Sequence, residues 1–193
     1  MRRAAGVTVV ALLLALSPVA GWLVATMPRL LLLAVPLWFV LGLAATAGGR
    51  RVWERGNPRG LTGLAWALGA FGFWMIPRSV DAVASSALVA GLMAASLFAA
   101  GALLAASWRR VPFVIRGALG IQGAAMTIAL GFVYLGYTAL LCGTFNLAQQ
   151  RQTGVWLLRL APVVVLIVVG AGARALHLAA RQRNRERLAA PTA

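Results

Sequence analysis

Charged groups are scarce in this sequence of 193 residues. Charged residues make up 11% of it, and the carboxylates are only Glu54, Asp81 and Glu186. There is one cysteine, one histidine and no lysine. A single cysteine excludes an internal disulfide and a cysteine-rich zinc or redox site, and a single histidine excludes a bis-histidine haem site. Because acid–base pairs, phosphate-binding loops and nucleophile motifs are also missing, we predict that the protein is not an enzyme.

Apolar residues are abundant, at 62% of the chain with a mean hydropathy of +0.88. Soluble domains average roughly 45–50% apolar and ~25% charged residues, so a water-soluble globule is excluded. Six helices of ~20 residues would use about 120 positions and leave only short loops. The sequence therefore predicts an all-α polytopic membrane helix bundle. Its single domain covers residues 1–180, and a basic tail covers residues 181–193.

The apolar runs predict six transmembrane helices, at about residues 7–27, 30–47, 61–76, 82–108, 118–141 and 155–176. The first run also has the basic start of a signal peptide. However, its apolar character continues through Val24 and exceeds the 7–15 residues of a signal core, so we expect it to be retained. The polar stretch 48–60 predicts a loop.

The arginines predict the orientation in the membrane. The six spans place fourteen arginines on one side, at positions 2, 3, 50, 51, 55, 59, 109, 110, 116, 174, 181, 183, 185 and 187. The other side receives four, at positions 29, 78, 151 and 159. Under the positive-inside rule this predicts that both termini lie in the cytoplasm. Trp22, Trp74 and Trp156 then fall at the outer interface, and Trp53 and Trp108 at the inner one.

The net charge of +15 raises the question of nucleic-acid binding. That function needs basic residues gathered on a folded face beside stacking aromatics. Here the arginines lie between apolar runs, so the expected partner is the lipid bilayer and not a nucleic acid.

Small residues recur every four positions, as close packing between membrane helices requires. The main row is Ala87, Gly91, Ala95 and Ala99, flanked by Ser86, Ala90 and Ala94; shorter rows are Ala65 with Gly69, and Thr127 with Gly131. We expect these rows to be packing seams inside the bundle. A homodimer face is the alternative.

Polar residues predicted at the outer rim are the candidate functional site. Arg78 lies three residues before Asp81, which is within pairing reach on a helix, and Asn146, Gln149 and Gln150 follow on a later outer loop. Two interpretations stay open: an Arg78–Asp81 pair that fixes the hairpin, or an anchor for a partner or substrate. We also expect Arg159 to extend its side chain towards this surface, and His177 to be an interfacial residue.

Met27, Met75 and Cys142 fall at the outer ends of three predicted spans. Soft sulfur ligands of this kind can hold Cu(I). The alternative is that they are packing residues, because methionine and cysteine commonly fill membrane and protein interiors.

Short motifs along most of the chain resemble the small CtaG-like integral membrane proteins of bacteria. The most specific are Trp74-Met75-Ile76-Pro77 with Asp81, and Leu141-Cys142 with Asn146 and Gln149-Gln150; others are Ser17-Pro18 with Trp22 and Ala25-Thr26-Met27, a second span containing Pro36, and Ser107-Trp108-Arg109. That family is associated with cytochrome c oxidase assembly. A Met-x-x-His-Met pattern typically opens its second span and supplies natural copper ligands. Here the stretch is Met27-Pro28-Arg29-Leu30-Leu31, without the histidine or second methionine.

The resemblance implies a non-enzymatic accessory or assembly protein of a respiratory oxidase-type complex, with oxidase subunits as partners and copper as a transient ligand. Two alternatives stay open: a structural subunit of a larger membrane complex, and a small channel or permease. The latter needs a polar pathway, and the polar residues deep in the spans are few: Ser86, Ser96, Gln122 and Thr127.

Overall fold

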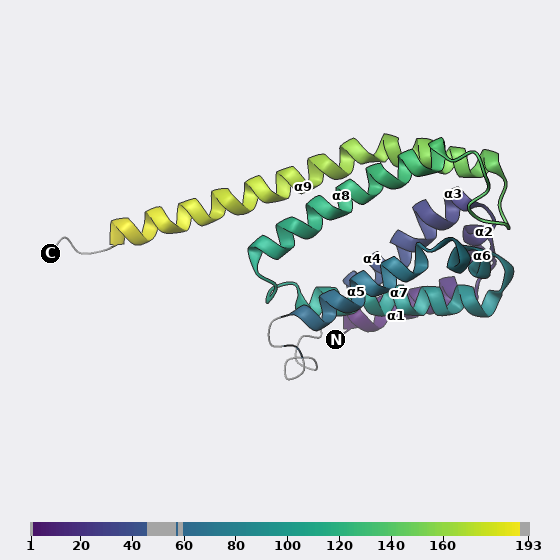
Figure 1. The fold of residues 1–193 in the computed structure, drawn as a ribbon. Coiled ribbons are helices and arrows are strands. Elements are labelled where there is room, and N and C mark those ends of the chain that lie inside the picture. Colours follow the sequence, from purple (N-terminus) through teal and green to yellow (C-terminus); the bar gives the residue numbers. More distant parts are fainter. Residues whose placement is uncertain (1, 46–56, 58–59, 190–193) are drawn as a thin grey trace.

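The computed structural model describes residues 2–45, 57 and 60–189. These residues form helices and connections, with no strand among them. Figure 1 shows the helices in chain order: α1 (Arg2–Leu16), α2 (Pro18–Val24), α3 (Met27–Arg29), the π-helix η1 (Leu30–Ala34), α4 (Val35–Ala45), α5 (Leu61–Trp74), α6 (Pro77–Ser85), α7 (Ala87–Ser107), α8 (Phe113–Gly136) and α9 (Leu147–Ala189). The predicted all-α class is confirmed. The predicted loop 48–60 lies mostly outside the described residues.

Several helices are long and apolar enough to cross a membrane. Within the described chain there are four: Met27–Ala45, which joins α3, η1 and α4, then α7, α8 and Leu147–Leu178 of α9. A fifth results if α1 and α2, which meet at an angle of 72°, count as one broken span. The apolar helix α5 has 14 residues. At about 1.5 Å per residue it covers about 21 Å, less than the ~30 Å of a hydrocarbon core.

The predicted first span is broken at Ser17. The Ser17 hydroxyl donates to the carbonyl of Leu14 at 2.8 Å, and the backbone at Ser17 is extended. Pro18 then begins α2, because proline has no N–H to lose at the first position of a helix.

The predicted fourth span is broken at Ser86. Its backbone is extended, and its side chain accepts a hydrogen bond from the Val89 N–H as the cap of α7. Residues 77–85 therefore form the separate helix α6, which buries Ser79, Val80 and Val83. The predicted span 82–108 therefore joins the end of α6, which is the more polar helix, to the whole of the apolar helix α7. Hydropathy alone does not show the break between them.

The last two predicted spans also begin earlier than expected, at Phe113 and Leu147. The 43 residues of α9 extend about 65 Å, roughly twice the hydrocarbon thickness. The helix includes Pro162 and continues through the predicted basic tail to Ala189.

Two groups of helices meet at one end of the molecule. Figure 1 shows α1, α4, α5 and α7 in one group and the α8–α9 hairpin in the other, with α2, α3, α6 and the 137–146 connection at the end where they join. The largest buried cluster lies towards this end and includes Met27, Leu30, Val80 and Leu97. Tyr134, Cys142 and Phe145 complete it from the hairpin side.

Glycines allow the closest helix contacts. A Cβ added to Gly42 of α4 would collide with the Phe98 carbonyl of α7, and one added to Gly101 would collide with the Phe39 carbonyl of α4. Gly154 of α9 also lies close to Gly131 of α8, where an added Cβ would be 2.9 Å from the Gly131 carbonyl oxygen. These pairs let the backbones approach without side chains between them.

The predicted seams are therefore only partly correct. Gly131 lies in a seam, whereas a Cβ on Gly91 or Gly69 would meet nothing within 4 Å. The row Ala87, Gly91 and Ala95 is exposed. In the flanking row, Ala94 is buried in the core and Ala90 packs against it. A helix rich in small residues offers more than one such row, and α7 packs on the face that contains Ala94 and Gly101.

Candidate functional site

Asp81 of α6 binds the backbone of the 137–146 connection. Its Oδ2 accepts a hydrogen bond from the Gly143 N–H at 2.9 Å, and its Oδ1 accepts one from the Thr144 N–H at 3.0 Å. The predicted pair with Arg78 is wrong: Arg78 is exposed, and no ion pair joins these two described residues. The carboxylate instead bridges segments 62 residues apart in the sequence.

The hydrogen bonds also shift the ionisation of Asp81. Partial burial acts to raise the pKa of its carboxyl, but the bonds from the Thr144 and Gly143 N–H groups outweigh burial and hold this pKa below the ordinary value of 3.8. Asp81 is therefore a carboxylate at neutral pH, and its charge stabilises the attachment of the connection to α6.

Gln150 is the most deeply buried polar group of the rim, with 1% of its surface exposed. Its Oε1 accepts from the Leu141 N–H at 3.0 Å, and its Nε2 donates to the carbonyls of Tyr137 and Ala139, both at 3.4 Å. These backbone groups follow the end of α8, where no helical partner exists for them. Gln150 thus fixes the turn that joins α8 to α9.

Asn146 and Gln149 lie at the start of α9. The Asn146 Oδ1 accepts from the Gln149 N–H at 2.9 Å, which is the geometry of a helix N-cap. The Gln149 Oε1 accepts a long bond, 3.5 Å, from the Met27 N–H at the start of α3. Asn146 is exposed and Gln149 is half-buried, so both amides border the outer surface.

The three predicted sulfur ligands belong to the packed core or its edge. Met27 is completely buried, Cys142 is 2% exposed, and Met75 packs against the same cluster. The Cys142 thiol points at the Pro77 carbonyl, with 3.8 Å between sulfur and oxygen. Burial, with a smaller effect of the Asp81 charge, raises the pKa of the thiol to about 11.

Copper binding by these residues stays a prediction. The thiolate is the form of cysteine that binds metals, and the raised pKa of Cys142 acts against its formation. The described residues contain no cluster of three histidine, cysteine or acidic side chains. Packing against the core is sufficient to explain where the three sulfur-bearing side chains lie.

Two polar contacts were not predicted from the sequence because they join residues that are distant along the chain. Asn57 is buried, donates to the Ser107 hydroxyl at 2.6 Å and accepts from the Thr62 N–H, which ties the start of α5 to the end of α7. The Trp74 indole donates to the Ser96 hydroxyl at 2.7 Å. For the Asn57 contact, the only indication in the sequence is the turn motif Gly56-Asn57-Pro58.

The Trp74 bond corrects the prediction that this residue lies at the outer interface. Ser96 lies nine residues from the start of α7, or about 14 Å along the helix. Trp74 is also buried, at 7% exposure. It therefore packs against the middle of α7.

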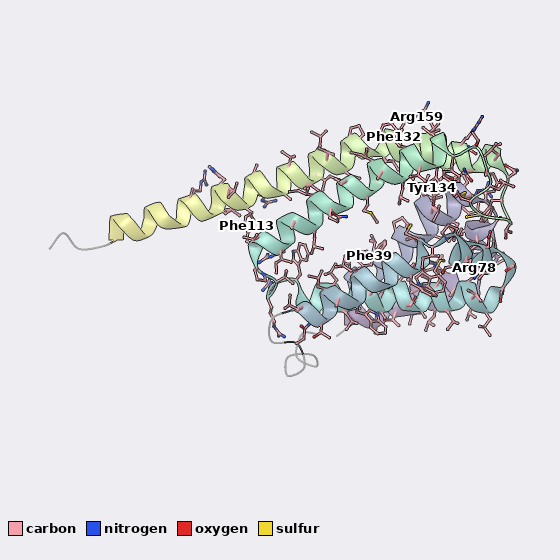
Figure 2. The ribbon with its side chains drawn as sticks, viewed as in Figure 1. Phe39, Arg78, Phe113, Phe132, Tyr134 and Arg159 are labelled. Carbon is pink, nitrogen blue, oxygen red and sulfur yellow. The ribbon has the colours of Figure 1, made fainter. Side chains whose placement is uncertain are left out.

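Three arginines lie over tryptophan rings. The distances from the guanidinium carbon to the ring centre are 4.2 Å for Arg29 and Trp22, 5.3 Å for Arg159 and Trp156, and 5.8 Å for Arg116 and Trp108. Each pair combines residues that the sequence assigns to the same membrane interface. Figure 2 shows Arg159 on the outer side of α9, pointing away from the other helices. His177 is exposed further along α9.

The rim therefore has a clear structural role. Asp81, Gln149 and Gln150 are brought together around the 137–146 connection, and they join α6, α3 and the hairpin through hydrogen bonds. Arg78 lies outside this network with its charge exposed. Comparison of the chain with protein-family models, curated proteins and solved structures found no match, so the resemblance to CtaG-like proteins stays a prediction.

Proposed function

We propose that this chain is a non-enzymatic accessory protein that binds another membrane protein along its α8–α9 hairpin. The observation that carries the proposal is the packing of the hairpin. In the membrane-crossing windows of α8 and α9, 17% and 11% of the residues are buried, against 39% for Met27–Ala45. The two helices pack on each other through Gly131 and Gly154 but leave most of their remaining apolar surface uncovered.

The junction at the rim supports this role. Asp81, Gln149 and Gln150 hold the hairpin against α3 and α6 at its outer end. Tyr134, Cys142 and Phe145 add apolar contacts at the same end. The attachment is local, so it orients the hairpin while the rest of its length stays available. Exposed Arg78 lies near the same end and supplies a polar contact for the partner outside the hydrocarbon.

The partner class that we propose is a respiratory oxidase-type complex of the bacterial inner membrane. This part of the proposal rests on the resemblance of Trp74–Pro77 and the Cys142–Gln150 segment to CtaG-like proteins. The proposed topology has six crossings and cytoplasmic termini, supported by the fourteen-to-four division of arginines. In it, α5 with residues 75–76 and part of α6 forms the third crossing.

Site-specific crosslinking in cells tests the proposal. A photoreactive phenylalanine analogue is placed at Phe132 of α8 or Leu166 of α9, which are 63% and 70% exposed. The control position is Leu88 of α7, which is 72% exposed but outside the hairpin. We expect adducts with the same membrane protein from the two hairpin positions and not from Leu88, with mass spectrometry identifying an oxidase subunit.

Each outcome is informative. Adducts with lipid alone at both hairpin positions would contradict a protein partner. A partner unrelated to respiratory oxidases would retain the accessory role and overturn the oxidase assignment.

A further inference from the structure

Two neighbouring cavities lie on the side of the molecule where α2 faces α6 and α7. The outer cavity has a volume of about 480 Å³ and the inner one about 310 Å³. Gly21, Val24 and Ala84 line both of them. Each volume lies within the range of roughly 300–1,000 Å³ that is typical of small-molecule sites.

The outer cavity is polar but uncharged. Its hydrogen-bonding side chains are Thr144, Asn146 and Gln149. The side-chain oxygens of Asn146 and Gln149 accept backbone hydrogen bonds, whereas their amide nitrogens donate to no group in the described part of the chain. The cavity therefore presents donors suited to ester or carbonyl oxygens. The Asp81 carboxylate, bound to Gly143 and Thr144 at the cavity wall, opposes an anionic ligand.

The inner cavity is mainly apolar. It is lined by the buried side chains of Trp38, Val83 and Met93, and by the small residues Ala87 and Gly91. The latter two are exposed on α7, a helix able to cross the membrane. The row of small residues that does not pack against another helix thus forms an open, smooth wall that hydrocarbon can reach from the side.

We propose that the paired cavities bind a neutral acyl lipid of the acylglycerol type. Its ester and hydroxyl groups occupy the outer cavity at Asn146 and Gln149, and its chain passes Gly21 and Ala84 to lie against Trp38 and Met93. The gradient from uncharged donors to apolar walls matches this amphiphile, and the position of Asp81 favours it over a fatty-acid anion. The site is separate from the α8–α9 surface proposed for the protein partner.

Photolabelling of the full-length protein in nanodiscs tests the site. The probe is a monoacylglycerol that carries a diazirine in its chain. We expect adducts on peptides containing Trp38 and Met93, and competition by unlabelled monoacylglycerol but not by the fatty-acid anion of the same length. Adducts confined to exposed faces of α8 and α9, or equal competition by the anion, would overturn the proposal.

Two variants sharpen the test. Gly21→Leu fills the junction of the cavities, where an added Cβ meets nothing within 4 Å, and should reduce specific labelling about tenfold. The matched control is Gly72→Leu on α5, which has the same free space but lines neither of these two cavities. Asn146→Asp keeps the cap oxygen of α9 but replaces the donors with anionic oxygen, so labelling should again fall about tenfold.

The variants also separate binding from folding. If Gly21→Leu does not fold, the labelling of the Asn146→Asp protein and the positions of the adducts on the wild-type protein still test whether the lipid binds in the cavities. Labelling unchanged in a folded variant of either kind would disprove the site, whatever the crosslinking of α8 and α9 shows.

Discussion

Gln150 shows how one buried amide can hold a turn in place. Both ends of its side chain bind backbone groups of residues 137–141, and its surface is almost fully removed from solvent. Removing it would leave the Leu141 N–H and two carbonyls without their partner, and each unsatisfied buried group costs about 1–3 kcal/mol.

We therefore expect Gln150→Leu to lower the free energy of unfolding by about 2–4 kcal/mol, because the leucine fills the space without satisfying these groups. The matched control is Gln152→Leu, since Gln152 is exposed on the same helix. Denaturant unfolding in detergent measures both. Equal stability of the two variants would show that the Gln150 bonds contribute nothing net.

Asp81 makes the stability of the rim dependent on pH. Its carboxyl has a pKa below 3.8 in the folded protein, so the folded state favours the charged form. The resulting stabilisation is complete above the unfolded pKa and disappears as the pH falls through the folded pKa.

At neutral pH, Asp81→Asn should lower the free energy of unfolding by about 1–2 kcal/mol, because the amide carries no charge and its single oxygen replaces the two that accept from Gly143 and Thr144. The difference from wild type should shrink as the pH approaches about 2. Paired unfolding curves from about pH 7 to about pH 2 check this. A difference that stays constant with pH would rule out the charge as its source.

At the scale of elements, the important choice is which face of a helix packs. Helix α7 has small residues on several faces, and its two glycines have opposite environments. Gly101 lies against the α4 backbone at Phe39, whereas Gly91 borders open space. Periodicity in the sequence predicts that such rows exist but does not rank them.

Gly101→Ala should therefore destabilise the bundle by about 1–3 kcal/mol or more, since the added methyl group would force α4 and α7 apart. Gly91→Ala on the same helix should change the unfolding free energy by less than about 1 kcal/mol. Thermal unfolding of the two variants gives the comparison. A greater loss in Gly91→Ala would mean that the exposed row is the packing seam.

At the scale of the whole molecule, the proposed topology makes a prediction about sidedness. The segment at Thr144 should face outwards, and the C-terminus should face the cytoplasm. In a Cys142→Ala background, Thr144→Cys should react with a membrane-impermeant thiol reagent added to intact cells, since Thr144 is exposed.

A reporter enzyme that is active only in the periplasm should stay inactive when fused after Ala193. The matched fusion after Gln152, which is exposed near the outer end of α9, should be active. If both fusions were active, or both inactive, the two positions would lie on the same side of the membrane. The last predicted span would then not cross the membrane, and the six-span arrangement would be refuted.

Composition and hydropathy alone were enough to predict a helical membrane protein. With so few charges and 62% apolar residues, backbone groups must be satisfied within helices, and the apolar runs are long enough to cross a bilayer. Arg29, Arg116 and Arg159 each lie over a tryptophan that the sequence assigns to the same interface, whereas Trp74 packs against the middle of α7. Hydropathy did not predict the helix breaks at Ser17 and Ser86, because short-range hydrogen bonds and extended backbone there interrupt apolar runs that look continuous in the sequence.

The tertiary structure alone decided how the polar residues are used. Asp81 was correctly placed near the amide-rich segment, but its partners are backbone N–H groups 62 and 63 residues away, not the neighbouring Arg78. Almost every residue has the same backbone N–H donor, so the sequence does not indicate which of these donors will form a hydrogen bond with a given carboxylate. Their availability depends on where α8 ends and how the chain turns. The sequence could therefore determine the all-α fold class of this protein, whereas only the packing of the helices could determine which groups its few polar side chains bind.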